Sequence, residues 1–231
     1  IKENLLLENK PLEVKDLCDK NKIKILSINA LQKFNIWNNE REIELLKLCN
    51  YASKANIWAI VLVPLNDGSA LNQTDQIDLL KISLRNISKI LNNYDLTGLV
   101  EPLGFMQSTL RKKSLVIQVI EEFQITNIKL LHDTFHHKLS EENNFYINTT
   151  GLVHISGVSN QFKDHKLTDD YRTVIENNDL IDNINQIKKF LKSGFSGVFS
   201  FEPFSEKFIN DVDKLNLTQK TFDFILSNLA K

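Results

Sequence analysis

The sequence predicts an α/β protein built on parallel β-strands. Short apolar runs alternate with longer segments in which apolar residues recur every three or four positions. The first pattern is typical of strands buried on both faces, and the second of amphipathic helices. Because the alternation continues without a linker, we expect right-handed crossovers within a single domain that spans residues 1–231.

The expected strands are short, rich in Ile, Leu, Val and Phe, and bounded by polar or turn residues. They lie at residues 23–29, 58–64, 98–101, 127–133, 151–156 and 197–202. The expected helices lie at residues 12–20, 40–54, 75–91, 109–123, 181–191 and 217–229. A short helical segment is expected after Thr134, and a polar loop over residues 160–178.

Apolar spacing assigns a buried face to four of these helices. The expected faces are Ile43, Leu46 and Cys49; Ile77, Leu80, Leu84, Ile87 and Leu91; Val116, Val119, Ile120 and Phe123; and Ile181, Ile184, Ile187 and Leu191. Six strand–helix units are thus countable, whereas a closed barrel of parallel strands needs eight. The residues alone leave open a barrel that lacks its first strands or an open sheet.

Composition excludes several classes of function. The 231 residues carry a formal net charge of −1 without a basic block, which argues against binding to nucleic acid or an anionic membrane. No stretch is long enough to span a membrane, and we expect no leader segment. Cys18 and Cys49 lack CxxC spacing and are expected to be buried apolar residues. These features predict a cytoplasmic protein.

Four expected strands end in a carboxylate or an imidazole: Glu101, Asp133, His154 and Glu202. In a parallel barrel the C-terminal ends of the strands converge on one mouth. A carboxylate at the end of an apolar strand must be solvated, paired or coordinated, because burying it alone is costly. Either glutamate alone would suggest a salt bridge at the rim, but the four residues together predict a metal site.

Three carboxylates and one imidazole form an oxygen-rich set that suits one divalent ion. Mn²⁺ is the first choice, with Mg²⁺, Co²⁺ or Zn²⁺ as alternatives. Glu101 and Glu202 are each followed by proline, which biases both toward extended backbone. On opposite sides of the ion they would form a catalytic pair, in which one removes a carbon-bound proton and the other returns it.

Three further residues are candidates for substrate binding. Asp133 and His136 form a D-x-x-H pair, and a spacing of three brings both side chains to one side of a starting helix. Arg172, in the polar loop, would clamp a hydroxyl or phosphate, or else form a surface salt bridge with a nearby aspartate. Asn66 follows the second strand and would line the mouth, although turn chemistry also explains Asn-Asp-Gly. His132 is expected to pack or lie exposed, as is its neighbour at position 137.

These motifs resemble those of the sugar phosphate isomerase/epimerase family, the xylose-isomerase-like barrels. The resemblance covers residue 23 to the C-terminus and rests on residues 100–103, 133–136 and 201–203 and the strand with His154. It implies a (β/α)8 TIM barrel whose first two strands are absent from this chain. It also implies that Glu101, Asp133, His154 and Glu202 hold the metal and that His136 contacts the substrate, and it strengthens the case for Arg172.

The longer motifs at residues 131–137 and 200–205 are most similar to family members of inositol catabolism, the inosose isomerase type. The resemblance implies isomerisation or epimerisation of a keto-sugar or keto-inositol through an enediolate. The partner is then a small sugar or cyclitol, with a homo-oligomer left open. An inosose dehydratase-type lyase and a degenerate sugar-binding barrel are the alternatives. Endonuclease IV shares the scaffold but uses many more metal ligands, which this chain lacks.

Overall fold

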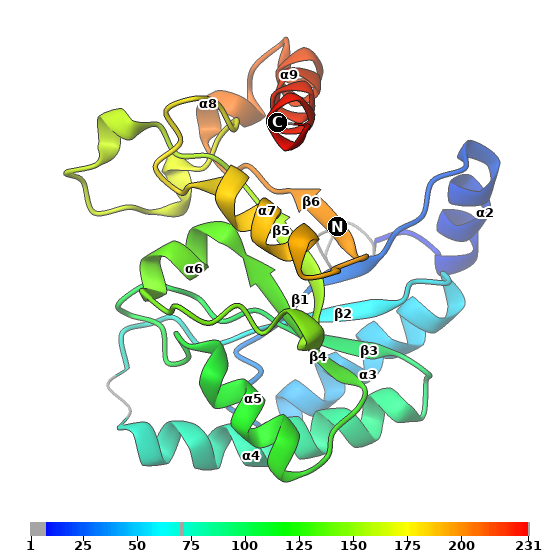
Figure 1. Ribbon diagram of the computed structural model, residues 1–231. Coiled ribbons are helices and arrows are strands. Elements are labelled where there is room, and N and C mark those ends of the chain that lie inside the picture. The colour runs from blue at the N-terminus through cyan, green and yellow to red at the C-terminus, as the bar shows by residue number, and fades with distance from the viewer. Residues whose placement is uncertain (1–7, 70–71, 231) are drawn as a thin grey trace. The chain divides into compact units, whose positions relative to one another are not determined.

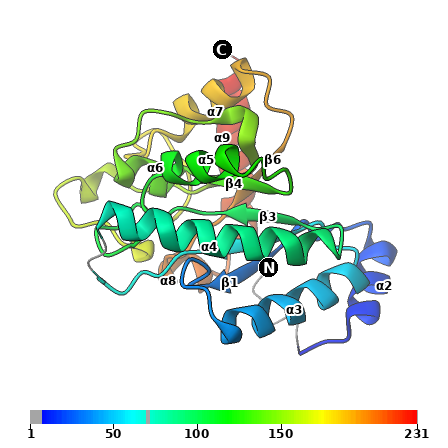
Figure 2. The ribbon, with the colours of Figure 1, turned by 90° about the horizontal axis from the view of Figure 1, so that it is seen from below.

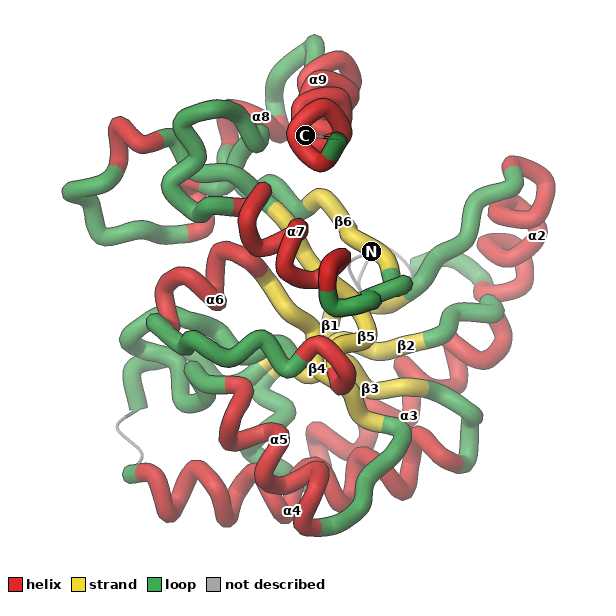
Figure 3. Tube along the Cα trace, in the orientation of Figure 1, coloured by secondary structure: helices red, strands yellow, loops and turns green. Residues whose placement is uncertain are grey.

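The computed structural model describes residues 8–69 and 72–230. Contacts between residues divide the chain into two compact units, Ile1–Leu131 and His132–Lys231. The described residues hold six strands that alternate with helices in the order of the chain (Figure 3). This confirms the predicted α/β class and the six strand–helix units, while the single domain stays a prediction.

The first unit contains β1 (Ser27–Gln32), β2 (Ala59–Val63), β3 (Thr97–Val100) and most of β4 (Ile128–Asp133). Each strand pairs in parallel with the next, as Figure 1 shows. Nearly every residue of β2 and β3 is buried. The strands are therefore covered on both faces, as their continuous apolar runs predict.

The helices of this unit are α2 (Pro11–Asn21), α3 (Asn39–Lys54), α4 (Gln73–Asn92) and α5 (Lys113–Glu122). Figures 1 and 2 show α3, α4 and α5 side by side along the strands, with α3 against β1 and β2 and α4 against β3. The apolar face predicted for α4 is confirmed over most of its length. Its fully or almost fully buried members are Leu80, Leu84, Ile87 and Leu91.

Two boundaries in the first unit differ from the prediction. The strand expected at residues 23–29 begins at Ser27, because its partner β2 begins at Ala59, directly opposite. Ile23 lies ahead of that pairing and is 62% exposed. The helix expected at residues 109–123 begins at Lys113, since Thr109 is bonded to the carbonyl of Leu65 through its backbone N–H and its hydroxyl.

The face predicted for α3 is wrong. Ile43 and Leu46 are 54% and 38% exposed. The buried stripe instead contains Leu45, Leu48 and Ala52, together with the correctly predicted Cys49. Both stripes have helical spacing and apolar members, so periodicity alone does not decide which one faces the strands.

The second unit contains the end of β4, β5 (Thr150–Ile155), β6 (Val198–Phe201) and four α-helices. The helices are α6 (Thr134–Ser140), α7 (Asn183–Lys192), α8 (Glu206–Ile209) and α9 (Lys214–Leu229). β5 pairs in parallel with β6, and its Val153 and Ile155 form a core with Ile187 and Phe190 of α7. Leu191, predicted to face inward, is 43% exposed because the adjacent Phe190 takes the buried position.

A long polar loop joins β5 to α7 and is mostly irregular, apart from the short turns η2 (Asn160–Phe162) and η3 (Asp169–Tyr171) (Figure 3). Its two arms are held together by an antiparallel bridge between Gly157 and Thr173. A Cβ atom at Gly157 would lie 2.0 Å from the carbonyl oxygen of Val174. Glycine therefore allows the arms to approach closely, which fixes the part of the loop that carries Arg172.

Neither cysteine forms a disulfide. Cys49 is buried, as predicted, and burial raises the pKa of its thiol to about 12. Cys18 is only half-buried, because α2 has no buried residues. Within residues 8–69 and 72–230, each helix is too short or too polar to cross a bilayer.

Candidate metal site

Three predicted metal ligands come together in the second unit. Asp133 is the last residue of β4, His154 is the last but one of β5, and Glu202 directly follows β6. Each offers a ligand atom, and these atoms lie within 4.8 Å of one another. Nδ1 of His154 is 3.0 Å from Oε2 of Glu202. Two carboxylates and an imidazole at this spacing fit a divalent cation.

Asp133 uses its two carboxylate oxygens differently. Oδ1 accepts a hydrogen bond of 2.9 Å from the backbone N–H of His136, which makes Asp133 the N-cap of α6. Oδ2 accepts a hydrogen bond of 2.5 Å from Nη2 of Arg172. The D-x-x-H motif thus marks a helix start that fixes the carboxylate of this predicted ligand. The residue His136 is itself buried.

Arg172 is almost completely buried, with 1% of its side chain exposed. Its guanidinium donates to Asp133 and, at 3.0 Å, to Glu202. It also donates to Asp169 at 3.2 Å and to the hydroxyl of Ser156 at 2.9 Å. The expected salt bridge with a neighbouring aspartate therefore exists, but the arginine is an internal residue that contacts two predicted ligands.

The electrostatics of this cluster keep Glu202 ionised. Burial alone raises the pKa of its carboxyl group, but the charge and hydrogen bond of His154 and the charges of Arg172 and His136 outweigh that effect. The pKa of Glu202 falls from 4.5 to about 2. At neutral pH the group is a carboxylate, the form that binds a cation or accepts a proton.

The other predicted site residues, Glu101 and Asn66, belong to the first unit. Glu101 directly follows β3, is 4% exposed, and donates its backbone N–H to the carbonyl of Leu62 at 3.1 Å. Asn66 lies in the turn after β2 and is exposed. The metal-binding and catalytic roles of Glu101, and the contact of Asn66 with substrate, stay predictions.

His132 and His137 belong to an aromatic cluster, which confirms the packing interpretation. Nε2 of His132 is 2.9 Å from Oε1 of Gln186. The His132 ring stacks on Phe145 with centroids 5.1 Å apart and contacts the His137 ring at 4.7 Å. Both imidazoles therefore pack within the second unit, next to Phe145.

Asn183, the first residue of α7, is fully buried and was not among the predicted site residues. Its side chain accepts a hydrogen bond of 2.7 Å from Thr134 and donates at 2.8 Å to the carbonyl of Ser156 and at 2.7 Å to Asp179. These bonds join the ends of β4 and β5 to the long loop. An asparagine at a helix start is too common to have signalled this role.

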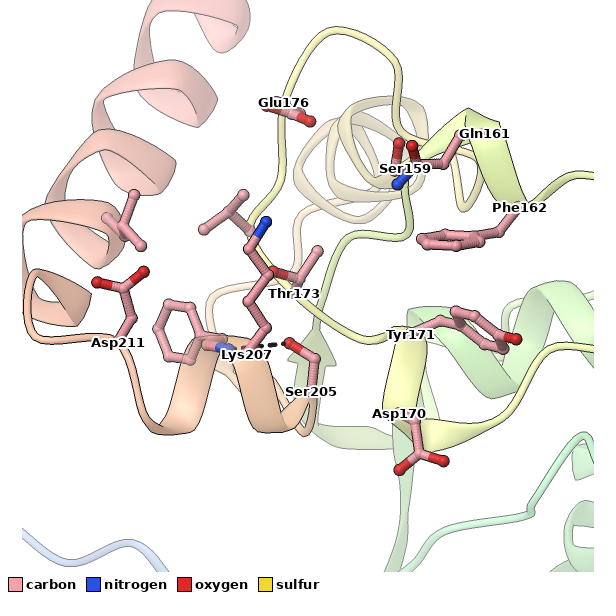
Figure 4. Close-up of a pocket in the computed structure, with 13 residues that line it drawn as sticks. Ser159, Gln161, Phe162, Asp170, Tyr171, Thr173, Glu176, Ser205, Lys207 and Asp211 are labelled. Atoms are coloured by element: carbon pink, nitrogen blue, oxygen red, sulfur yellow. Dashed lines mark hydrogen bonds between the residues drawn. The ribbon is translucent and has the colours of Figure 1, made fainter.

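A cavity of about 620 Å³ lies between the long loop, α8 and α9 (Figure 4). Tyr171 and Thr173, the chain neighbours of Arg172, form part of its wall, and Tyr171 packs on Phe162 with ring centroids 4.5 Å apart. Its charged lining residues, such as Lys207, are exposed or half-buried. The cavity therefore lacks the buried ionised groups that distinguish the carboxylate cluster.

Comparison with known proteins identifies the architecture. The family model described as a xylose isomerase-like TIM barrel matches residues 3–227. A xylose isomerase domain-containing protein from Salmonella typhimurium LT2 is 31% identical, with a TM-score of 0.83, over 96% of this chain and 81% of that chain. The family model confirms the predicted barrel over the open sheet.

Two other solved structures share the fold at lower identity. The IolI protein with a bound zinc atom is 19% identical, with a TM-score of 0.87, over 100% of this chain and 87% of that chain. The D-psicose 3-epimerase of Clostridium cellulolyticum H10 is 16% identical, with a TM-score of 0.75, over 99% of this chain and 88% of that chain. Comparison with the sequences of curated proteins found no match.

Proposed function

Because the chain belongs to the xylose isomerase-like TIM barrel family, as its motifs predicted, we propose that it is a metal-dependent isomerase or epimerase. Its substrate is a keto-sugar or a keto-inositol. The observation that carries the proposal is the convergence of Asp133, His154 and Glu202 at three consecutive strand ends. Removing polar side chains from water costs free energy, so we would not expect an inactive barrel to retain this group of buried and half-buried residues.

Asp133, His154 and Glu202 would hold the ion. We propose Glu101 as the fourth ligand, on the strength of the Glu-Pro motif that it shares with Glu202. This donor set suits Mn²⁺ first, and the zinc bound by the structurally similar IolI protein makes Zn²⁺ the principal alternative, ahead of Mg²⁺ and Co²⁺. When bound, the ion would polarise the substrate carbonyl and so acidify the neighbouring C–H group.

Glu101 and Glu202 would carry out the proton transfer. One carboxylate removes the proton beside the carbonyl, giving an enediolate, and the other returns a proton to the adjacent carbon or to the opposite face. Glu202 is ionised at neutral pH because His154 and Arg172 lower its pKa, and so it is ready to accept a proton. We assign proton removal to Glu202 and proton return to Glu101.

We propose that the substrate is a small polyhydroxylated ring or chain. His136, Arg172 and Asn66 stay the candidates for contacts with its hydroxyl groups. Both ketoses and inososes offer the carbonyl with an adjacent hydroxyl that this chemistry needs. A dehydratase reaction on the same scaffold would begin with the same proton removal but would then expel a hydroxyl as water.

Metal dependence tests the proposal. The protein is stripped with EDTA, dialysed, and assayed on a panel of ketoses and inososes, without metal or with added Mn²⁺, Zn²⁺, Mg²⁺ or Co²⁺, and the products are identified by NMR. We expect turnover with Mn²⁺, none in EDTA, and recovery on adding back the ion. Undiminished turnover in EDTA, or no turnover of any panel member with any of the four ions, would contradict the proposal.

A further inference from the structure

Arg172 contacts the carboxylate groups of two proposed metal ligands. Its Nη2 atom lies 2.5 Å from Oδ2 of Asp133 and 3.0 Å from Oε2 of Glu202. The same Oε2 atom is 3.0 Å from Nδ1 of His154. One nitrogen of the guanidinium thus bridges two proposed ligands, Asp133 and Glu202. The third, His154, contacts the same oxygen of Glu202.

The rest of the Arg172 side chain is anchored firmly. Nε donates to the Ser156 hydroxyl at 2.9 Å and Nη1 to Asp169 at 3.2 Å. The guanidinium carbon lies 5.1 Å from the ring centroid of Phe135 and 4.7 Å from that of Phe204, positions that favour cation–π attraction. With 1% of its side chain exposed, this arginine cannot exchange its partners for water without moving the loop.

The backbone of Arg172 is tied to the site as well. Its carbonyl oxygen accepts hydrogen bonds from the N–H groups of Phe204 at 3.0 Å and Ser205 at 2.8 Å, just after Glu202. The residue therefore connects the ends of all three strands: β4 through Asp133, β5 through Ser156, and β6 through Glu202. An exposed arginine that formed only a surface salt bridge would not make these hydrogen bonds to three strand ends.

The buried carboxylate of Asp133 and the half-buried carboxylate of Glu202 repel each other, and each is costly to desolvate unless a cation compensates. The Arg172 guanidinium supplies that cation at hydrogen-bonding distance. A divalent ion at the same oxygens would supply it too, and it would be repelled by the guanidinium. We infer that Arg172 is a built-in counter-cation that positions Asp133 and Glu202 and competes with the metal ion for their oxygens, thereby setting the metal affinity.

This inference rests on the metal site of the proposed function, and it couples the Arg172 guanidinium to the affinity of that site for the ion. A bound ion would compensate the charge of the carboxylates in place of Arg172. Loss of the arginine should therefore lower the stability of the fold more in EDTA than in saturating metal. By linkage, a variant without the guanidinium then binds the ion more tightly and gains more thermal stability from it. A purely structural arginine would lower stability equally under both conditions.

The test is a titration of Mn²⁺ into wild type and Arg172→Met, with calorimetry for Kd and thermal melts in EDTA and in saturating Mn²⁺. We expect Arg172→Met to bind Mn²⁺ at least about tenfold more tightly and to show a larger rise in Tm on adding the ion. The matched control is Arg41→Met. Arg41 is also buried, and it pairs with Glu40 and Glu44 on α3, so its loss should leave Kd unchanged.

A second variant covers the case in which Arg172→Met does not fold in EDTA. Arg172→Lys keeps the charge, but a single ammonium group lacks the fork that reaches Asp133, Glu202 and Ser156 together. Its Mn²⁺ affinity should fall between those of wild type and Arg172→Met. Equal or weaker binding by folded Arg172 variants overturns the inference alone, whereas wild type that binds no divalent ion overturns the proposed function and this inference together.

Discussion

Asp133 and His136 are joined by a hydrogen bond of 2.9 Å from the backbone N–H of His136 to Oδ1 of Asp133. The same aspartate ends β4 and caps α6, so the start of the helix fixes its carboxylate. Its second oxygen accepts a hydrogen bond from Arg172, and the carboxylate lies near Glu202 and His154. Folding of a seven-residue helix and orientation of a proposed metal ligand thus depend on one side chain.

The two roles of Asp133 can be separated by substitution. Asp133→Asn keeps an oxygen that caps the helix but removes the charge, whereas Asp133→Ala removes both. We expect both variants to lose Mn²⁺ affinity by about 100-fold or more. In urea titrations with EDTA, Asp133→Ala should be about 1 kcal/mol less stable than Asp133→Asn, because it alone loses the cap. Wild-type Mn²⁺ affinity in Asp133→Asn would rule out a ligand role.

Substitution of Glu202 tests its catalytic role. Glu202→Gln retains the shape of the side chain but cannot accept the proton, so kcat at saturating metal should fall by about 10²–10⁴-fold. Glu206→Gln is the control, because Glu206 lies four residues further on, at the exposed start of α8. Its kcat should stay within about twofold of wild type. Glu202→Gln with wild-type kcat would mean that another group removes the proton.

The lowered pKa of Glu202 makes a prediction about acid stability. In EDTA the folded protein holds the pKa at about 2, below the ordinary 4.5, so the unfolded chain binds the proton first as the pH falls. The stabilisation is therefore fully present above pH 4.5 and is lost as the pH drops toward 2.

The stabilisation from ionised Glu202 should be of the order of 1–3 kcal/mol. Urea unfolding at a series of pH values in EDTA measures it, with Glu202→Gln as the comparison. Between pH 5 and the lowest pH at which the protein stays folded, wild type should lose stability more steeply than the variant. Parallel curves would show that the paired charge of Glu202 does not contribute to stability.

Asn183 should be a strong determinant of stability. It is fully buried, and Asn183→Ala would leave the hydrogen-bonding groups of Thr134, Ser156 and Asp179 without their shared partner. The free energy of unfolding should fall by about 2–4 kcal/mol. Asn185→Ala, on the exposed side of the same helix, should change it by less than about 0.5 kcal/mol. Equal effects of the two substitutions would contradict the network.

The sequence predicted the strand ends near the site well, for a physical reason. From β3 to β6 the expected boundaries agree with the structure within one residue, because apolar runs stop where a polar functional side chain must begin. This is why Asp133, His154 and Glu202 could be predicted to lie together at strand ends, as candidate ligands, without any structure. Their grouping within 4.8 Å follows from strands that run parallel and end together.

Features that depend on tertiary contacts could not be predicted. The burial of Arg172 follows from the course of a long loop, which is set by pairing between Gly157 and Thr173 and by hydrogen bonds to Phe204 and Ser205. None of these contacts has a local sequence pattern. The inward face of α3 was equally undetermined, since two apolar stripes on one helix compete for the same strands.

Deuterium exchange tests the proposed proton transfer most directly. Mn²⁺-loaded protein is incubated in D₂O with each ketose and inosose of the panel, and the carbon-bound protons are followed by NMR. We predict that for one substrate class the proton beside the carbonyl is replaced by deuterium without loss of water, and that EDTA or Glu202→Gln stops the exchange. Exchange that persists in EDTA, or elimination of water instead of isomerisation, would contradict a metal-dependent isomerase or epimerase.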